Sequence, residues 1–228
     1  MSIIRTEKLN KIYDGAAVPV HATNNVTLSF EKGEFTALVG PSGCGKTTLL
    51  NLIGGLDKPT SGEVYVEETK LSTLTERQII DFRLKNIGFV FQAYNLIPVL
   101  TARENVEFIM HLQGIDKEER AKRVEELLDR VGLKDKMDQR PSALSGGEQQ
   151  RVAVARALAS KPKYVLADEP TANLDSASTA NLLDIMLRLN EEDNITFIFS
   201  THDSRVMKRA RRLITLDDGR VVSDEVFK

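Results

Sequence analysis

The sequence predicts an α/β fold in which helices cover a mainly parallel sheet and an α-helical segment is inserted into that core. Short apolar runs alternate with longer stretches of helical periodicity along the 228 residues, and this alternation is typical of parallel sheets with helical crossovers. A glycine-rich loop stands between a buried apolar run and a helix. The stretch from about 95 to 160 has helical periodicity and no clear strand, so we expect it to form the inserted lobe.

The first half of the chain is predicted to contain four strands and one helix. Val26, Leu28 and Phe30 alternate with other residues, which indicates a strand with one buried face. A turn at Gly33 and Glu34 leads into the next apolar run. The remaining predicted elements are, in chain order, a buried strand at 35–39, a helix at 46–53, a turn at 58–62, and strands at 63–66 and 87–91.

The second half continues the alternation after a long helical stretch. Apolar residues recur at helical spacing between Thr101 and Val131, and Pro141 interrupts the chain before a further helix. The last predicted elements are strands at 164–167 and 195–199, with a helix around 182–189 between them. We find no internal repeat, coiled-coil heptad or low-complexity tail.

Composition and charge exclude several classes of protein. Apolar residues make up 41% of the chain and charged residues 28%, which is typical of a globular protein. The 31 basic and 33 acidic residues nearly cancel, so we expect no nucleic-acid partner. The single cysteine, Cys44, excludes an internal disulfide and fits a reducing compartment. We predict no signal peptide and no transmembrane helix, so a membrane role would have to come through a partner.

The glycine-rich loop predicts a nucleotide site. The residues of this phosphate loop are Gly40, Pro41, Ser42, Gly43, Cys44, Gly45, Lys46 and Thr47. They match the pattern G-x-x-x-x-G-K-[ST] in its strand–loop–helix context, in which backbone N–H groups wrap phosphates. Lys46 is expected to reach the β- and γ-phosphates, and the Thr47 hydroxyl to bind Mg²⁺. We interpret Cys44 as a small filler of the loop and not as a redox switch.

Two acidic residues, Asp168 and Glu169, follow the predicted strand at 164–167. A carboxylate at the end of a buried strand near a phosphate loop commonly holds Mg²⁺, and we assign this role to Asp168. Glu169 could polarise the attacking water as a general base. Pro170 fixes the turn after them. The alternative is a pair of solvated acids at a strand end.

Two further polar residues stand at strand ends. His202 follows the strand at 195–199, and a parallel arrangement would bring it to the edge that carries Glu169, where it could contact the γ-phosphate. Gln92 follows the strand at 87–91 and could touch Mg²⁺ or water. His21 and His111 have no such context, and we interpret them as structural.

A second glycine-bearing segment, the signature segment at 144–151, predicts how the nucleotide is used. Ser145 precedes Glu148 by three residues, the spacing of a capping box at a helix start. Gly146 and Gly147 would leave the first N–H groups of that helix uncovered, and such groups form an anion site. Because the chain already has a phosphate loop, this second site would serve a nucleotide held by another copy. The alternative is an ordinary capped helix.

The order of five segments then resembles a known family: phosphate loop, glutamine, Leu-Ser-Gly-Gly, Asp-Glu and histidine. This order is similar to the nucleotide-binding subunits of ABC transporters, and the similarity covers nearly the whole chain. The resemblance implies one ABC ATP-binding domain over 2–228. Its fold would be a P-loop NTPase (RecA-like) core at about 1–94 and 161–228, with a small N-terminal antiparallel β subdomain and a helical subdomain at about 95–160. It also implies ATP and Mg²⁺ as ligands.

The resemblance implies a head-to-tail dimer that encloses two ATP molecules. Each ATP would lie between residues 40–48 of one copy, including Thr48, and residues 145–148 of the other. Asp175 would reach across the dimer. Tyr13 stands where the family has an aromatic that stacks on adenine, although it could instead be an aromatic of a surface strand. In this scheme Glu169, His202 and Lys46 are catalytic, and Thr47, Gln92 and Asp168 face the metal.

A narrower resemblance concerns residues 88–106, which look like the subgroup of macrolide exporters and lipoprotein-releasing ATPases. It implies a location at the cytoplasmic face of the inner membrane and an integral membrane permease subunit with a large extracytoplasmic domain. The segment around Gln92 to Asn105 would grip a short helix of that subunit. ATP binding would close the dimer and hydrolysis would open it. The sequence Phe108-Ile-Met differs from the Leu-Pro pair of many relatives, which leaves the exact partner open.

Three other classes of ATPase share part of this pattern, and one of them stays open. A non-transport ABC ATPase that acts with a membrane protein in cell division stays open. A DNA-repair ATPase would need a coiled-coil arm, for which the 53 positions between Gln92 and Ser145 leave no room. A P-loop GTPase or kinase would leave the signature segment unexplained. The substrate and the direction of transport do not follow from the sequence.

Overall fold

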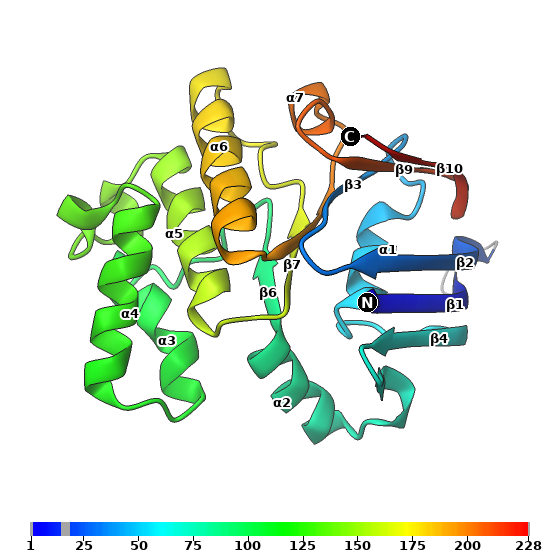
Figure 1. The fold of residues 1–228 in the computed structure, drawn as a ribbon, viewed down its shortest axis with the longest axis horizontal. Coiled ribbons are helices and arrows are strands. Elements are labelled where there is room, and N and C mark those ends of the chain that lie inside the picture. Colours follow the sequence, from blue (N-terminus) through cyan, green and yellow to red (C-terminus); the bar gives the residue numbers. More distant parts are fainter. Residues whose placement is uncertain (1, 15–18, 228) are drawn as a thin grey trace.

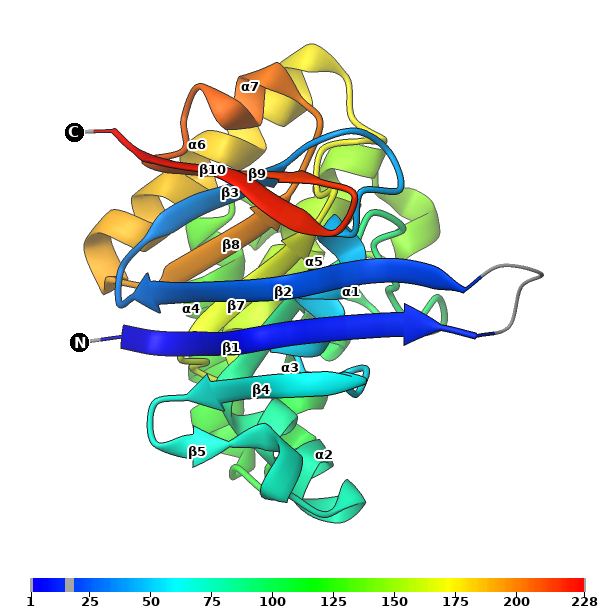
Figure 2. The ribbon, with the colours of Figure 1, turned by 90° about the vertical axis from the view of Figure 1, so that its right-hand side faces the viewer.

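Two β-sheets with one helix between them form the larger part of the molecule, and a helical lobe adjoins the larger sheet (Figures 1 and 2). The computed structural model describes residues 2–14 and 19–227. Residues 1, 15–18 and 228 lie outside the described residues. The predicted ends of the ATPase core at about residues 1 and 228 therefore lie outside them as well.

The larger sheet is parallel except at one edge. Its six strands are β3 (Phe35–Val39), β6 (Ile87–Val90), β7 (Tyr164–Asp168), β8 (Thr196–Ser200), β9 (Arg212–Asp217) and β10 (Arg220–Val226), in the order β10-β9-β3-β8-β7-β6. Only the β9–β10 pair is antiparallel. The predicted α/β fold is therefore confirmed, and the sequence analysis missed β9 and β10.

The smaller sheet is antiparallel and contains the N-terminal strands. Its strands are β1 (Ser2–Tyr13), β2 (Val20–Glu31), β4 (Ser61–Val66) and β5 (Thr69–Lys70), in the order β2-β1-β4-β5. Helix α1 (Lys46–Ile53) packs between this sheet and the parallel one (Figure 1). Leu49 and Ile53 of α1 share a buried cluster with Ile4 of β1 and Ile198 of β8. The helix that follows the phosphate loop is thus packed against a β-sheet on each of two sides.

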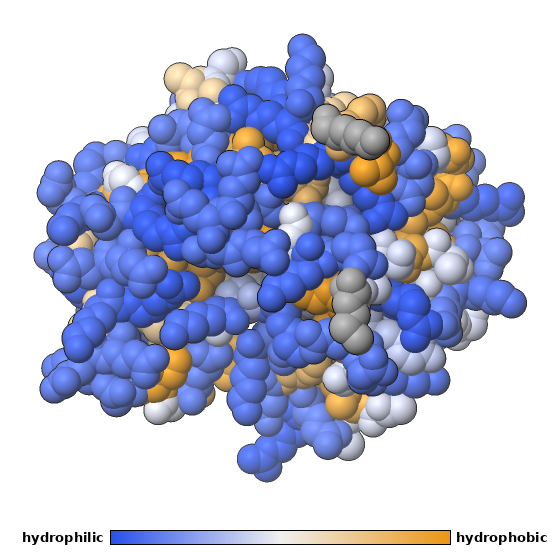
Figure 3. Space-filling model, viewed as in Figure 1, coloured by the Kyte–Doolittle hydropathy of each residue, from blue (hydrophilic) through white to orange (hydrophobic). Residues whose placement is uncertain are grey.

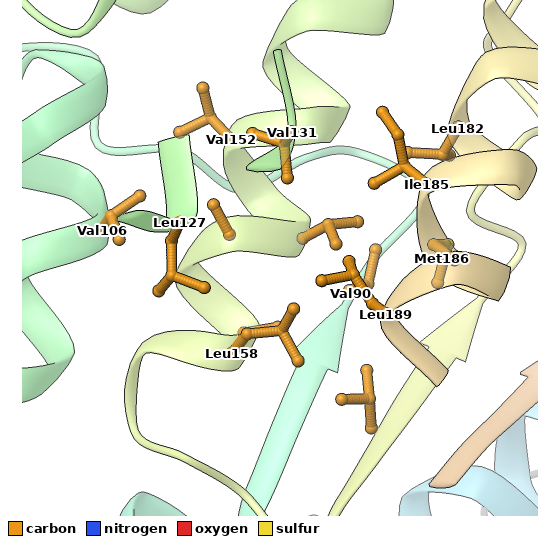
Figure 4. Packing of buried hydrophobic residues seen from close by; sticks show 14 of the residues in the cluster. Val90, Val106, Leu127, Val131, Val152, Leu158, Leu182, Ile185, Met186 and Leu189 are labelled. Carbon is orange, nitrogen blue, oxygen red and sulfur yellow. The ribbon is translucent and has the colours of Figure 1, made fainter. Parts of the chain in front are cut away.

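The other face of the parallel sheet packs on the helical lobe and on α6 (Ser176–Asp193). Phe35 and Phe199 turn their rings to this side, with centroids 4.6 Å apart. Figure 4 shows how Val106, Leu127 and Leu158 continue the same packing into the lobe. A single buried cluster therefore joins lobe and sheet, so that burial of apolar surface stabilises both together.

Three α-helices and two short 3₁₀ helices connect β6 to β7. They are α3 (Ala102–Leu112), α4 (Lys117–Arg130), η2 (Lys134–Lys136), η3 (Pro141–Ala143) and α5 (Gly146–Ala159). The helical pattern predicted from 101 to 131 forms two helices, α3 and α4. Gly114 has a φ of +74°, and Asp116 caps α4 by accepting hydrogen bonds from Glu118 N and Glu119 N. These two residues end one helix and begin the next.

The remaining helices are α2 (Glu76–Asn86), preceded by η1 (Leu71–Thr73), and α7 (Ser204–Met207). Among the described residues, no helix is both long and apolar enough to cross a membrane. On the face shown in Figure 3, hydrophobic residues lie in small, separate areas within a largely hydrophilic surface.

Candidate nucleotide-binding site

The carboxyl ends of four adjacent parallel strands bring distant polar residues to one edge of the sheet. Strands β3, β8, β7 and β6 are neighbours in parallel register. The phosphate loop follows β3, Thr201 and His202 follow β8, Glu169 follows β7 and Gln92 comes two residues after β6. Open α/β sheets bind their ligands at this kind of edge.

The phosphate loop has a conformation that requires glycine at two positions. Gly40 and Gly45 have φ values of +142° and +100°. A Cβ atom would lie 2.1 Å from Leu216 O at Gly40 and 2.0 Å from Ala22 O at Gly45, so a side chain would collide with backbone at both. The loop thus packs tightly against β2 and β9.

The lysine of the loop is tied to its own backbone. Lys46 Nζ donates to Gly40 O at 2.8 Å and to Pro41 O at 2.9 Å. Cys44 is buried, with Sγ 3.8 Å from the same ammonium. The ammonium is therefore held inside the curve of the loop, where it can meet the phosphates of a nucleotide.

A cleft of about 760 Å³ opens beside this loop. Its walls contain twelve of the residues named from the sequence: Tyr13, Gly40, Pro41, Ser42, Gly43, Gly45, Lys46, Thr47, Thr48, Gln92, Glu169 and His202. Val20, Ala22 and Ala172 complete the lining, and the sequence analysis did not identify them. The volume is within the range of small-molecule and cofactor pockets.

The carboxylate of Asp168 lies against the helix that follows the loop. Thr47 Oγ1 donates to Asp168 Oδ1 at 2.9 Å, and the Ser200 hydroxyl donates to the same oxygen. Hydroxyl and carboxylate oxygens are the donors that Mg²⁺ prefers. Within the described residues, no three His, Cys, Asp or Glu side chains lie together in a group that could hold a metal.

Glu169 is held in a strained conformation that aims its carboxylate at the cleft. Its φ is +46°, uncommon for a residue with a side chain, and its N–H donates to Ser200 O at 3.0 Å. Oε1 is 2.9 Å from His202 Nδ1. Oε2 is buried and has no hydrogen-bond partner among the described residues. Strain and an unsatisfied acceptor are typical of residues kept for chemistry.

The segment after β6 is fixed by two side chains from distant parts of the chain. Asn173 Nδ2 donates to Gln92 O at 3.0 Å. Arg156 of α5 donates to Tyr94 O at 2.8 Å and also to Asn95 O. Tyr94 and Asn95 have φ values of +52° and +50°, so these bonds hold two consecutive residues in the left-handed region. The sequence analysis identified Gln92 but neither Arg156 nor Asn173.

The Tyr13 ring lies at the rim of the cleft and is oriented by two neighbours. Its hydroxyl donates to Asp57 Oδ2 at 2.7 Å, and Lys11 Nζ lies 4.8 Å from the ring centroid. Burial, together with the Asp57 carboxylate, raises the pKa of the Tyr13 hydroxyl, so the hydroxyl stays protonated and keeps donating. Tyr13 is 42% exposed, so its ring could receive a planar base.

Replacing Tyr13 with Ala is expected to raise the KM for ATP about tenfold with little change in kcat. The basis is that stacking of a base on an aromatic contributes roughly 1–3 kcal/mol. Titration with a fluorescent ATP analogue measures the change directly. Tyr13→Phe keeps the ring and should cost less, and Tyr65→Ala, on β4 outside the cleft, serves as control. Unchanged affinity in Tyr13→Ala would mean that the base does not stack here.

The signature segment lies outside the cleft. The predicted capping box is present: Ser145 Oγ accepts from Glu148 N at 3.3 Å and Glu148 Oε2 accepts from Ser145 N at 2.8 Å. Both glycines of the segment are also closely packed against neighbouring side chains. A Cβ at Gly146 would be 2.8 Å from the Tyr94 hydroxyl oxygen, and one at Gly147 would be 2.9 Å from Ser178 Oγ. Gly147 is buried, so these glycines are also needed for packing within the subunit.

Asp175 has a local role in the chain as described. It is the N-cap of α6, where its carboxylate accepts from Ser178 N at 2.9 Å and from Ser178 Oγ at 2.7 Å. The same Ser178 hydroxyl also lies beside Gly147 of the signature segment. Neither Asp175 nor the signature segment lines the cleft of its own chain.

The fold and the phosphate loop at the sheet edge define the chain as a P-loop ATPase. The model of the ABC transporter family matches residues 23–172, and the chain belongs to this family. It is the ATP-hydrolysing, ATP-driven subunit of an ABC transporter. An uncharacterised ABC transporter ATP-binding protein of Methanocaldococcus jannaschii is 47% identical over 96% of this chain and 98% of its own length.

Two relatives with assigned systems are similar over almost the whole chain. The lipoprotein-releasing system ATP-binding protein LolD of Legionella pneumophila is 42% identical over 98% of both chains. The macrolide export ATP-binding/permease protein MacB of Mannheimia succiniciproducens is 43% identical over 98% of this chain, which spans 35% of that longer protein. These are the two systems of the predicted subgroup.

Among solved structures, a second cassette of Methanocaldococcus jannaschii matches with a TM-score of 0.90 and 43% identity, over 99% of each chain. That structure is a dimer in a post-hydrolysis state bound to ADP and phosphate.

Proposed function

We propose that the chain binds Mg²⁺-ATP in this cleft and hydrolyses it between two copies of itself, at the cytoplasmic face of the cell membrane. The observation that carries the proposal is that the phosphate loop and the glycine-bearing start of α5 lie apart in one chain. The phosphate loop lines the cleft, and the capped start of α5 with its glycines does not. A head-to-tail pair of chains would let each α5 start face the nucleotide of the other copy.

Each polar group of the cleft has a distinct task in this scheme. The backbone of the phosphate loop and Lys46 bind the phosphates. Thr47, Asp168 and Gln92 would hold Mg²⁺, which supplies positive charge to the β- and γ-phosphates when bound. Glu169, whose side chain lines the cleft, accepts a proton from the attacking water. His202, 2.9 Å from the other oxygen, orients that carboxylate and can reach the γ-phosphate.

A second hollow, a groove separate from the nucleotide cleft, is the proposed contact for the membrane subunit. It has a volume of about 440 Å³ and lies between α2, α3 and α5. Ile80 is 55% exposed and Phe108 is 38% exposed, and both line it together with Asn95 and Ile97. Exposed apolar side chains in a groove suit the apolar face of a short helix. Asn95 and Arg156 line the groove and are joined by a hydrogen bond beside Gln92, so the groove is linked to the nucleotide site.

The proposed partner is an integral membrane subunit with a large extracytoplasmic domain, as in the exporter and lipoprotein-releasing systems. The tagged chain, purified from detergent-solubilised membranes, should bring down such a subunit in stoichiometric amount. Its outer domain would then indicate the substrate class. Recovery of cell-division proteins instead would favour the non-transport alternative.

Replacing Phe108 with Asp is expected to reduce recovery of the membrane subunit about tenfold or more, because burial of one Phe side chain contributes roughly 1.5–3 kcal/mol. The ATPase rate of the isolated subunit should change little, since Phe108 lies outside the cleft. Val222→Asp, at an apolar side chain of β10 that is 60% exposed, is the control. Equal recovery with Phe108→Asp and with the control would place the contact elsewhere.

A further inference from the structure

Both carboxylate oxygens of Glu148 are engaged at the start of α5. Oε2 accepts the hydrogen bond from Ser145 N, and Oε1 is paired with Lys136 Nζ. The Glu148 side chain is 16% exposed and that of Lys136 is 41% exposed. A partly buried pair is screened less by salt than one on the open surface.

The position of Lys136 is set by the fold of the helical lobe. It closes η2, where its N–H donates to Leu133 O at 3.0 Å and its carbonyl accepts from Gln139 N at 3.1 Å. Leu133 and Met137 on either side are buried in the cluster that joins the lobe to the sheet. The ammonium is therefore presented to the start of α5 by a backbone that is held in place on both sides.

The charge of Glu148 is not needed for the helix cap. A glutamine can close the same capping box, and α2 of this chain does so with Thr75 and Gln78. The hydrogen bond from Lys136, with that from Ser145 N, lowers the pKa of Glu148 to about 2. Glu148 is negatively charged at neutral pH, as an ordinary glutamate would be, and at the helix start this charge would strongly repel an incoming phosphate if nothing neutralised it.

We propose that Lys136 neutralises Glu148 so that the signature segment can receive the phosphates of ATP held by a second copy of the chain. This inference rests on the proposed role of the signature segment. Lys136 acts here as a positioning residue, since it works through Glu148. Its removal would expose the phosphates to an unbalanced carboxylate, and ATP-driven closure would then require more nucleotide.

The test measures the ATP concentration that gives half-maximal dimer, by light scattering, in a Glu169→Gln background that slows hydrolysis. Lys136→Ala should raise this concentration about tenfold, and the increase should shrink as salt is added. Adding Glu148→Gln to Lys136→Ala should reverse most of this increase in the half-maximal ATP concentration, because no carboxylate is then left to neutralise. Lys134→Ala is the matched control, since Lys134 lies on the same turn and pairs with Glu125 instead.

The double variant Lys136→Ala/Glu148→Gln distinguishes a role of Lys136 in neutralising charge from a purely structural role of the salt bridge. If the pair only stabilised the lobe, the double variant would be no better than Lys136→Ala, and that result would overturn the inference. A Lys136→Ala variant with the ATP dependence of the Lys134→Ala control would overturn it as well. Failure of the underlying proposal looks different: Ser145→Arg in the same background would then form dimers at unchanged ATP concentration.

Discussion

Glu169→Gln is expected to bind ATP, to lose hydrolysis and to accumulate as a dimer. The amide keeps the size and the hydrogen bonding of the side chain but cannot take a proton from water. General bases contribute about 10²–10⁴-fold to a rate, so turnover should fall by at least 10²-fold. Because hydrolysis would no longer remove the nucleotide that bridges two copies, the dimer should persist on size exclusion with ATP and Mg²⁺.

Glu191→Gln is the matched control for this variant. Glu191 is exposed at the end of α6 and pairs with Arg211 on the surface, so the same chemical change there should leave turnover and dimerisation unaltered. A Glu169→Gln protein that stays monomeric at saturating ATP and Mg²⁺ would count against closure of the isolated subunit. Turnover at the unmodified rate would remove Glu169 as the base.

Ser145→Arg is expected to keep ATP binding in the cleft and to lose hydrolysis. Ser145 is exposed at the start of α5, so a long charged side chain can be placed there without entering the core. It would cover the N–H groups proposed to face the other copy's nucleotide. Removal of one donor that stabilises developing charge typically costs 10²–10³-fold in kcat, and a comparable loss should appear in a steady-state phosphate-release assay.

The same substitution also removes a helix cap, which costs about 1 kcal/mol of stability. Ser142→Arg, three residues earlier on the exposed side of η3, controls for added charge and bulk near the helix. Thermal unfolding of both variants measures the loss of the cap separately. If Ser145→Arg turned over ATP like Ser142→Arg, the signature segment would have no part in catalysis.

The buried strands were predictable because a short continuous run of apolar residues, bounded by turn residues, indicates a strand that is buried on both faces. Strands β3, β7 and β8 are buried along almost their whole length, and the predicted runs match them within one or two residues. Helix α2 was missed, since none of its residues is buried. Strand β10 was missed for the same reason, because most of its residues are exposed.

Site residues that lie in contiguous motifs were predictable, whereas their supporting contacts were not. The phosphate loop and the acidic pair can be found from short patterns. The bonds from Asp57 to Tyr13, from Ser200 to Asp168 and from Lys136 to Glu148 join residues that only the folded chain brings together. No short pattern around Asp57, Ser200 or Lys136 indicates their partners. The assigned roles of Glu169, His202 and Asp175 stay predictions until the variants are measured.

The two connections of the helical lobe have a mechanical consequence. The chain leaves the sheet at the carboxyl end of β6, beside the nucleotide cleft, and returns at the start of β7, at the opposite end of the neighbouring strand. The return is anchored by the bond from Lys163 N to Asn86 O at 2.8 Å. Nucleotide therefore lies beside one connection and far from the other, so a force at Gln92 would act on the cleft end of the lobe while the far connection stays in place. A small movement at Gln92 would thus become a larger displacement at the outer end of the lobe.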